Sequence, residues 1–229
     1  TKGLLDKSYI ASRSALISEQ TSLSSYSAGT PPGAPVRTSA ISGEVSGTTH
    51  FVAVDGTGNV ASMTSTVEGP FGSQLVANGY VLNNELTDFT MMPEKDGAPV
   101  ANRVQAGKRP VSSMSPTIVY DAQGKPVFVV GAAGGKTIIM QVAKTLIAHL
   151  DWGLSAQDAI AAPNIYYAGD AVQVEGNTPL AAMAGELSQY GRTVLTLDMP
   201  RLKANAAERT KDGWTGAADP RSEGVALKE

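Results

Sequence analysis

The chain has 229 residues and a formal net charge of −3, with 42% hydrophobic and 17% charged residues and no cysteine. This composition is typical of a globular protein with a sizeable core, and it lacks the concentrated positive charge expected of a protein that binds nucleic acid or anionic lipid. The absence of cysteine excludes thiol catalysis, disulfides and cysteine metal sites, and no stretch approaches the roughly 18 consecutive apolar residues of a membrane-spanning helix.

Residues 1–47 differ in composition from the rest of the chain. Residues 1–17 fit a helical pattern only loosely and show none of the features of a signal peptide, so we interpret the chain as part of a larger protein. Residues 19–47 are rich in Ser, Thr, Gly and Pro, which predicts an exposed linker.

Two β-hairpins are predicted after this linker. HFVAVD and NVASMTST have the composition of strands, and GTG at 56–58 supplies the turn between them. PTIVYDAQGKPVFVV predicts a second hairpin that turns at Gln123-Gly124, with residues 127–130 as a fully buried strand.

Three helices and a strand complete the expected elements. KTIIMQVAKTLIAHL predicts a helix with its apolar face at positions 139, 142, 143, 146 and 150. A short helix is expected from Ser155, with Asp158 as its capping partner, and a longer one from Thr178 to Tyr190, followed by the strand TVLTLD. Hairpins followed by helices favour an α+β architecture over alternating βαβ units.

Candidate functional residues begin with a threonine at the boundary between linker and hairpin. Thr48 follows Gly47 directly, and its hydroxyl becomes a nucleophile only if a nearby base takes the proton; a plain strand-edge threonine is the simpler alternative. Glu68, Glu85 and Asp88 follow strands and could hold an ammonium group, although they could also be solvated.

Hydroxyl and glycine clusters follow further along the chain. Ser112 and Ser113 could bind a carboxylate or simply form a turn. Gly134 and Gly135 precede a helix, and their N–H groups could approach an oxyanion. The spacing from Gly131 is one residue short of a phosphate-binding loop, so we expect no nucleotide site; the two histidines lie far apart, so we expect no metal and no cofactor.

Five ordered motifs resemble one family. TTHFVAVDGTGNVASMTSTVEGPFGS, LNNELTDF, PVSSMSPTIV, GAAGGKTI and GAADPRSEG are similar to the small subunit of the gamma-glutamyltranspeptidases, and residues 1–47 resemble the C-terminal end of the large subunit. The resemblance implies an N-terminal-nucleophile hydrolase with a four-layer αββα sandwich, of which this chain supplies part. It also implies a precursor that cuts itself between Gly47 and Thr48, which divides the chain into residues 1–47 and 48–229.

The resemblance also assigns roles to residues. Thr48 matches the nucleophile and Thr66 the threonine that hydrogen-bonds it; Gly134 and Gly135 match the oxyanion hole. Glu68, Glu85 and Asp88 match positions that bind the α-amino group of the γ-glutamyl moiety, and Ser112 and Ser113 match those that bind its α-carboxylate. The family often has a small polar residue in place of Lys136, and it takes a further arginine from the large subunit.

We therefore expect γ-glutamyl transfer or hydrolysis of glutathione and related compounds, in a heterodimer with the large subunit of the same precursor. Periplasmic or secreted location is what the family implies. The alternatives are an acylase for glutaryl-type β-lactam side chains, a poly-γ-glutamate processing enzyme, and an uncut homologue that only binds its ligand.

Overall fold

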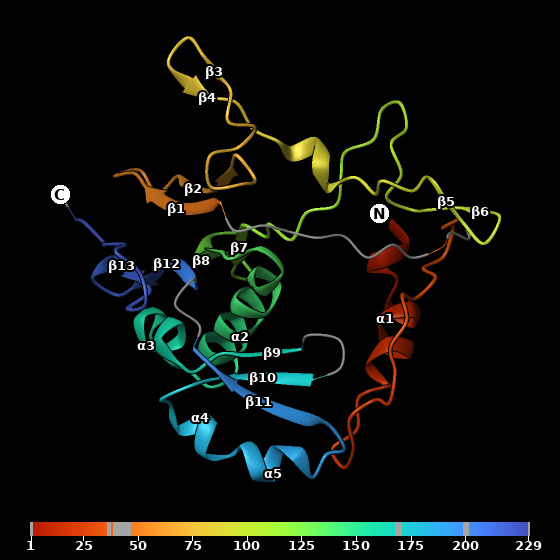
Figure 1. Ribbon diagram of the computed structural model, residues 1–229. Coiled ribbons are helices and arrows are strands. Elements are labelled where there is room, and N and C mark those ends of the chain that lie inside the picture. The colour runs from red at the N-terminus through yellow and green to blue at the C-terminus, as the bar shows by residue number, and fades with distance from the viewer. Residues whose placement is uncertain (1, 36–37, 39–46, 168–170, 199–201, 229) are drawn as a thin grey trace.

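The computed structural model describes residues 2–35, 38, 47–167, 171–198 and 202–228 (Figure 1). Its centre is an antiparallel sheet of four strands in the order β13-β12-β8-β7. The strands are β7 Thr117–Tyr120, β8 Pro126–Ala133, β12 Lys203–Thr210 and β13 Gly213–Ala218. The predicted β7–β8 hairpin is confirmed, although its first buried position is Phe128 and Val127 is half-buried.

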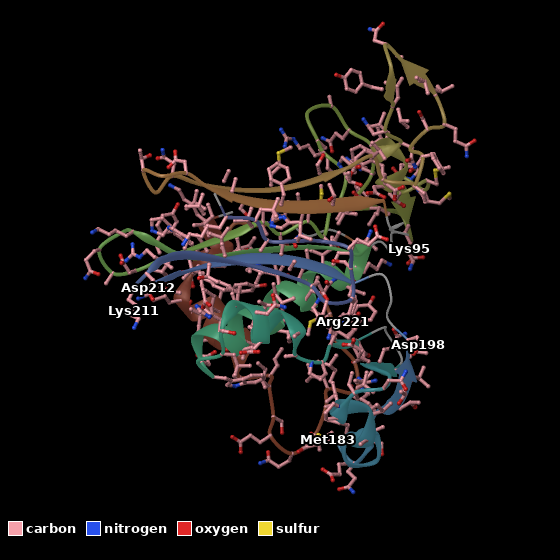
Figure 2. All side chains as sticks on the ribbon, turned by 90° about the vertical axis from the view of Figure 1, so that its left-hand side faces the viewer. Lys95, Met183, Asp198, Lys211, Asp212 and Arg221 are labelled. Carbon is pink, nitrogen blue, oxygen red and sulfur yellow. The ribbon has the colours of Figure 1, made fainter. Side chains whose placement is uncertain are left out.

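The other predicted hairpin lies on one face of this sheet (Figure 2). Its strands are β1 Thr48–Val54 and β2 Val60–Thr66, which pair in the expected antiparallel register. Alternate side chains point toward the sheet, and His50 is the buried one among them. The neighbouring set on the opposite face includes Phe51 and Met63, which pair with each other and remain about half exposed. The hairpin therefore has one packed face and one open face.

Two helices cover the other face of the sheet, α2 Ile138–Leu150 and α3 Ala156–Ala161. The core between sheet and helices includes Phe128, Val130, Ile138 and Ile160. The capping of α3 by Ser155 is confirmed, since its hydroxyl accepts a hydrogen bond from the Asp158 N–H at 3.1 Å.

The predicted apolar face of α2 was only partly correct: Val142 is buried and Leu146 packs against the core, as expected. Positions 139 and 150 are exposed, and the residues that are buried are Ile138, Gln141, Val142, Thr145 and Ala148. The helix is rotated because polar Gln141 faces the sheet, where its side-chain amide donates to the Ala133 carbonyl at 2.9 Å. A pattern based only on apolar residues cannot include such a position.

A smaller sheet in the order β11-β10-β9 lies beyond the helices (Figure 1). Its strands are β9 Ile165–Tyr167, β10 Ala171–Glu175 and β11 Thr193–Leu197, and β10 and β11 run parallel. The single helix predicted from Thr178 to Tyr190 was wrong, because α4 Pro179–Ala182 and α5 Ala184–Ser188 meet at Met183, whose ψ is 3°. Gly185 lies next to this break, and glycine in a helix interior lowers helix stability.

The remaining described elements are short. They are η1 Lys2–Leu5, α1 Lys7–Ser14, β3 Val76–Ala77, β4 Tyr80–Val81, η2 Glu85–Asp88, β5 Glu94–Lys95, β6 Ala98–Pro99 and η3 Gly135–Thr137. The β3–β4 hairpin projects away from the rest (Figure 1). The expected linker carries no helix or strand over residues 19–35, and most of its last part lies outside the described residues. Within the described chain, no helix is long and apolar enough to cross a membrane.

Candidate active site

The hairpin β1–β2 brings two threonine hydroxyls together. Thr48 opens β1 and pairs with Thr66, the last residue of β2. The Thr48 Oγ1 donates to the Thr66 Oγ1 at 3.3 Å, which is long for a hydroxyl–hydroxyl bond. Thr66 Oγ1 also accepts from the Glu68 N–H at 2.8 Å. The Thr66 hydroxyl is thus fixed by the backbone that follows β2, whereas its hydrogen bond with the Thr48 hydroxyl is weak.

His50 fastens the start of β1 to the central sheet. Its ring stands over Gly131 so closely that a methyl group there would overlap it, and its carbonyl accepts from the Asn205 side-chain amide at 2.8 Å. Its Nδ1 hydrogen-bonds the Thr64 hydroxyl at 2.8 Å. Burial lowers the pKa of His50 to about 4, so this ring is neutral near pH 7 and serves as a packed anchor.

The turn after β2 is shaped by a residue that the sequence patterns did not single out. Asn84 accepts from the Gly69 N–H at 2.9 Å through its side-chain oxygen, and its amide nitrogen donates to Glu68 Oε2 at 3.1 Å. Glu68 is buried and has a φ of 71°, a conformation that costs a non-glycine residue free energy. Asn84 lies inside the motif LNNELTDF, but its role emerges only from the fold.

The acidic segment η2 contributes two more carboxylates. Glu85 opens it and is half-buried, whereas Asp88 closes it and is buried beside Phe89. The side chain of Asn102 donates to the Asp88 carbonyl at 2.6 Å and accepts from the Val111 N–H at 3.0 Å. Asn102, which sequence reasoning also missed, therefore joins the acidic segment to the loop that precedes the paired serines.

The serine loop lies at the end of that connection. Ser112 is exposed, and its Oγ accepts from the Met114 N–H at 3.3 Å. Ser113 is buried, and its carbonyl accepts from the Ser115 hydroxyl at 2.9 Å. These bonds form a tight turn, and both serines line the same pocket as Thr48.

The glycine pair turns the chain from β8 into α2. Gly134 has a φ of 135° and Gly135 one of 61°, values that residues with a Cβ rarely adopt. The Thr137 hydroxyl donates to the Gly134 carbonyl at 2.8 Å, and Gln141 reaches both Thr137 Oγ1, at 3.0 Å, and the backbone of β12. Gln141 thus holds the glycine turn against the sheet. A polar residue among the apolar ones of α2 is the signal that could have identified it.

These loops enclose a pocket at one end of the hairpin. Its lining contains all the residues expected for the site except Gly134, which lies just outside and orients Gly135. Met114 and Ile138 add an apolar part that sequence reasoning missed. The full lining is Thr48, Thr66, Glu68, Glu85, Asp88, Ser112, Ser113, Met114, Gly135 and Ile138.

The pocket combines groups with complementary chemistry. A threonine hydroxyl lies among carboxylates that suit a cationic group, serine hydroxyls that suit a carboxylate, and a glycine N–H at a turn that suits an oxyanion. In the continuous chain, the Thr48 nitrogen is still part of the peptide bond to Gly47. Among the described residues, no group of three or more His, Cys, Asp or Glu side chains is arranged to hold a metal ion.

Comparisons with known proteins identify relatives along the whole chain. The Glutathione hydrolase proenzyme of Bacillus subtilis (strain 168) is 36% identical over 186 residues, covering 79% of this chain and 30% of the relative. The Acylase ACY 1 proenzyme of Pseudomonas sp. (strain SE83) is 31% identical over 225 residues, covering 97% of this chain and 37% of the relative. The chain therefore spans about a third of these curated relatives.

A solved structure has a similar fold. The gamma-glutamyltranspeptidase from Pseudomonas nitroreducens, complexed with L-DON, superposes with a TM-score of 0.69 and 31% identity, covering 79% of this chain and 99% of that one. The α+β class is confirmed, and the hairpin, the central sheet and the helices α2 and α3 form part of the N-terminal-nucleophile hydrolase fold. The family model for gamma-glutamyltranspeptidase matches residues 1–228, and the chain belongs to that family.

Proposed function

We propose that this chain provides the catalytic part of an enzyme that transfers or hydrolyses γ-glutamyl groups, with glutathione among its substrates. The observation that carries the proposal is the gathering of Thr48, the carboxylates, the paired serines and Gly135 around one pocket. Family membership and the names of relatives, such as Glutathione hydrolase proenzyme, support it. We propose no cofactor, because the chemistry needs only side chains and backbone N–H groups.

The enzyme first cuts its own chain between Gly47 and Thr48. The Thr48 hydroxyl attacks the Gly47 carbonyl, the C–N bond breaks as the nitrogen takes up a proton, and water then hydrolyses the resulting ester. This leaves residues 1–47 as the end of the large subunit and residues 48–229 as the small subunit. The released α-amine has an ordinary pKa of roughly 7.7–8.0 and so suits a general base near neutral pH.

In the transfer reaction, the Thr48 hydroxyl attacks the γ-amide carbon and gives its proton to its own amine. The N–H groups of Gly134 and Gly135 donate to the developing oxyanion, and Thr66 orients the nucleophile. The leaving amine takes the proton, and a γ-glutamyl ester of Thr48 remains. Water or an acceptor amine resolves this ester and restores the hydroxyl.

The substrate's two charged groups determine how it lies in the pocket. Glu68, Glu85 and Asp88 bind its α-ammonium group, and the hydroxyls of Ser112 and Ser113 bind its α-carboxylate. This assignment is supported by their positions on the lining, with Glu85 and Asp88 on a segment that Asn102 connects to the serine loop. Charge-assisted bonds at both ends would hold the γ-carbon beside Thr48.

The upstream part of the same precursor is the proposed partner in a heterodimer. The outer face of the β1–β2 hairpin carries Phe51 and Met63 side by side, with about half of each exposed. Covering this pair would complete the layered fold and bury apolar surface. A periplasmic or secreted location belongs to the same proposal and rests on the family alone.

A related acylase activity is the second candidate. The relative named Acylase ACY 1 proenzyme aligns with 97% of the chain, which supports an acylase as the second candidate. A glutaryl side chain has no α-ammonium group, so an acylase for it would have no use for three carboxylates. Turnover of γ-glutamyl anilide and glutaryl anilide separates the two: the proposed function predicts a strong preference for γ-glutamyl, and the reverse preference would favour the acylase.

The first experiment is denaturing mass spectrometry of the precursor produced together with its upstream part. We expect a fragment that begins at Thr48 and, in the same preparation, release of aniline from γ-glutamyl anilide. An intact chain without turnover after long incubation would overturn the proposal and indicate a homologue that only binds its ligand.

A further inference from the structure

The residue before the candidate nucleophile occupies an unusually narrow place. Gly47 lies just outside β1, and its Cα faces the backbone of Glu68 and Gly69. A methyl group built on that Cα would overlap the Glu68 carbonyl oxygen and would lie 2.7 Å from the Gly69 carbonyl oxygen. Contacts of this kind force atoms to move, so any residue other than glycine must displace part of the chain here.

The backbone of Glu68 and Gly69, which faces Gly47, is held in place by hydrogen bonds. The Glu68 N–H donates to the Thr66 hydroxyl at 2.8 Å, and the Gly69 N–H donates to Asn84 Oδ1 at 2.9 Å. The Gly69 carbonyl itself accepts from the Gly72 N–H at 2.9 Å. Glu68 is already in the left-handed region. Moving the Glu68–Gly69 backbone would break these bonds, so a side chain at position 47 would instead displace residue 47 itself.

Resting on the self-cleavage proposed above, we propose that Gly47 is a positioning residue for that cleavage, because the missing Cβ lets the bond to be cut lie against the Glu68–Gly69 backbone. Gly47 carries the carbonyl that Thr48 attacks, so displacing it moves the reacting carbon relative to the hydroxyl. Thr48 is held separately by the backbone pairing of β1 with β2, which places it opposite Thr66, so it would not follow the displacement.

The requirement acts only before cleavage. Once the bond is cut, Gly47 ends in a carboxylate and is no longer joined to Thr48. The pocket that acts on external substrates is lined by residues from Thr48 onward. A substitution at position 47 therefore slows maturation and leaves the mature enzyme unchanged.

The test uses Gly47→Ala in the full precursor with its upstream part. Cleavage is followed over time by denaturing mass spectrometry, and we expect it to be slowed about 100-fold, since a displacement of ~1 Å has an effect of that order. kcat/KM for γ-glutamyl anilide, expressed per cleaved molecule, should equal that of the wild type. Gly56→Ala is the matched control, because Gly56 belongs to the same hairpin and faces open space; it should cleave at the wild-type rate.

A general folding defect is distinguished by thermal melting. Thr48→Ala precursors with and without Gly47→Ala stay uncut and should melt at the same temperature. If Gly47→Ala cleaves as fast as the wild type, or if the melting temperature falls, this inference is overturned while the proposed function stands. A wild-type precursor that never cleaves overturns both.

Discussion

Two polar regions of this molecule use hydrogen bonds in opposite ways. Around the pocket, neutral side chains such as Thr66, Asn84 and Gln141 bind backbone groups and shape turns. Behind α3, the Arg221 cluster, which consists of Lys144, Glu175, Asp219 and Arg221, joins charged side chains to one another and to backbone carbonyls. Arg221 is labelled in Figure 2, beside the helices that cover the central sheet.

The Arg221 cluster closes the end of α3. The Arg221 guanidinium donates to the carbonyls of residues 160, 161 and 162, and the Lys144 ammonium donates to those of 159, 160 and 162 at 2.8–3.0 Å. Arg221 also pairs with Glu175 and, at 3.0 Å, with Asp219. Burial, followed by the nearby Arg221, lowers the pKa of Lys144 to about 8. Cations at a helix C-terminus satisfy its last carbonyls and oppose its dipole.

The difference indicates what each region contributes. In the Arg221 cluster the charged groups bond to one another and to the backbone, and so they hold segments of the chain together. Removing one of these groups should therefore lower the stability of the fold. In the pocket the hydrogen bonds fix the backbone, while the proposed reactive groups line the space for a substrate. Changes there should lower activity more than stability.

Thr48→Ala should abolish self-cleavage and lower γ-glutamyl anilide turnover by a factor on the order of 10⁴ or more, because one hydroxyl serves both reactions in the proposed mechanism. Mass spectrometry and an anilide assay measure the two losses. Thr48→Ser keeps a hydroxyl and should retain part of both activities. Full turnover by the alanine variant would remove Thr48 from the mechanism.

Arg221→Met should lower the free energy of unfolding by about 3–5 kcal/mol, because the buried carboxylates of Glu175 and Asp219 lose the cation that pairs with them. Urea unfolding measures the change. Arg209→Met is the matched control, since Arg209 pairs with Asp121 at 3.3 Å near the surface and such pairs contribute about 0–1 kcal/mol. Equal losses from both variants would refute the structural role of the cluster.

Asn84→Ala should lower kcat/KM about tenfold to a hundredfold, as expected when a part-buried hydrogen-bonding group worth about 1–3 kcal/mol is removed from beside Glu68. Steady-state kinetics on the cleaved enzyme measure it. Asn59→Ala removes an equivalent side chain from the exposed turn at the other end of the hairpin and should leave kinetics unchanged. A large loss of stability in Asn84→Ala without a kinetic effect would contradict the claim that changes around the pocket lower activity more than stability.

His50 should make the protein less stable in acid. Its folded-state pKa is about 4 against an ordinary 6.5, so between these values the unfolded chain binds a proton that the folded chain does not. Lowering the pH through this window therefore favours unfolding, by up to about 2–3 kcal/mol. Urea unfolding at several pH values measures the slope. His50→Gln cannot take up that proton and should flatten the slope; an unchanged slope would assign the acid sensitivity elsewhere.

Local sequence patterns predicted the two β-hairpins, but they did not predict β12, one of the two inner strands of the central sheet. The hairpins β1–β2 and β7–β8 were predictable because strand-forming residues flank glycine turns. Strand β12, the neighbour of β8, was missed because KANAAERT has little strand propensity. Its alanines, Ala204, Ala206 and Ala207, are buried, and Ala204 and Ala206 belong to the core between the sheet and the helices. Tertiary packing selected these residues, so no sequence window could reveal the strand.

The candidate site shows the same division. The polar residues that line the pocket, and Gly135, were named from motif resemblance, and the fold brings them together, whereas the apolar Met114 and Ile138 were missed. The residues that hold the loops, namely Asn84, Asn102 and Gln141, were missed because each acts on backbone distant in the sequence. Polar side chains with such partners look like surface residues until the chain is folded.

The position of β12 in the sheet has a consequence for the timing of maturation. Strand β8 ends at Ala133, whereas β12, which pairs with it, begins at Lys203. Asn205 of β12 also holds the His50 carbonyl, two residues from Thr48. While the ribosome is still producing the intervening segment, β1, the strand that begins with the proposed nucleophile, lacks β12, which is one of the strands it packs against. The proposed self-cleavage should therefore wait until synthesis has passed β12, so that an incomplete nascent chain is not cut prematurely.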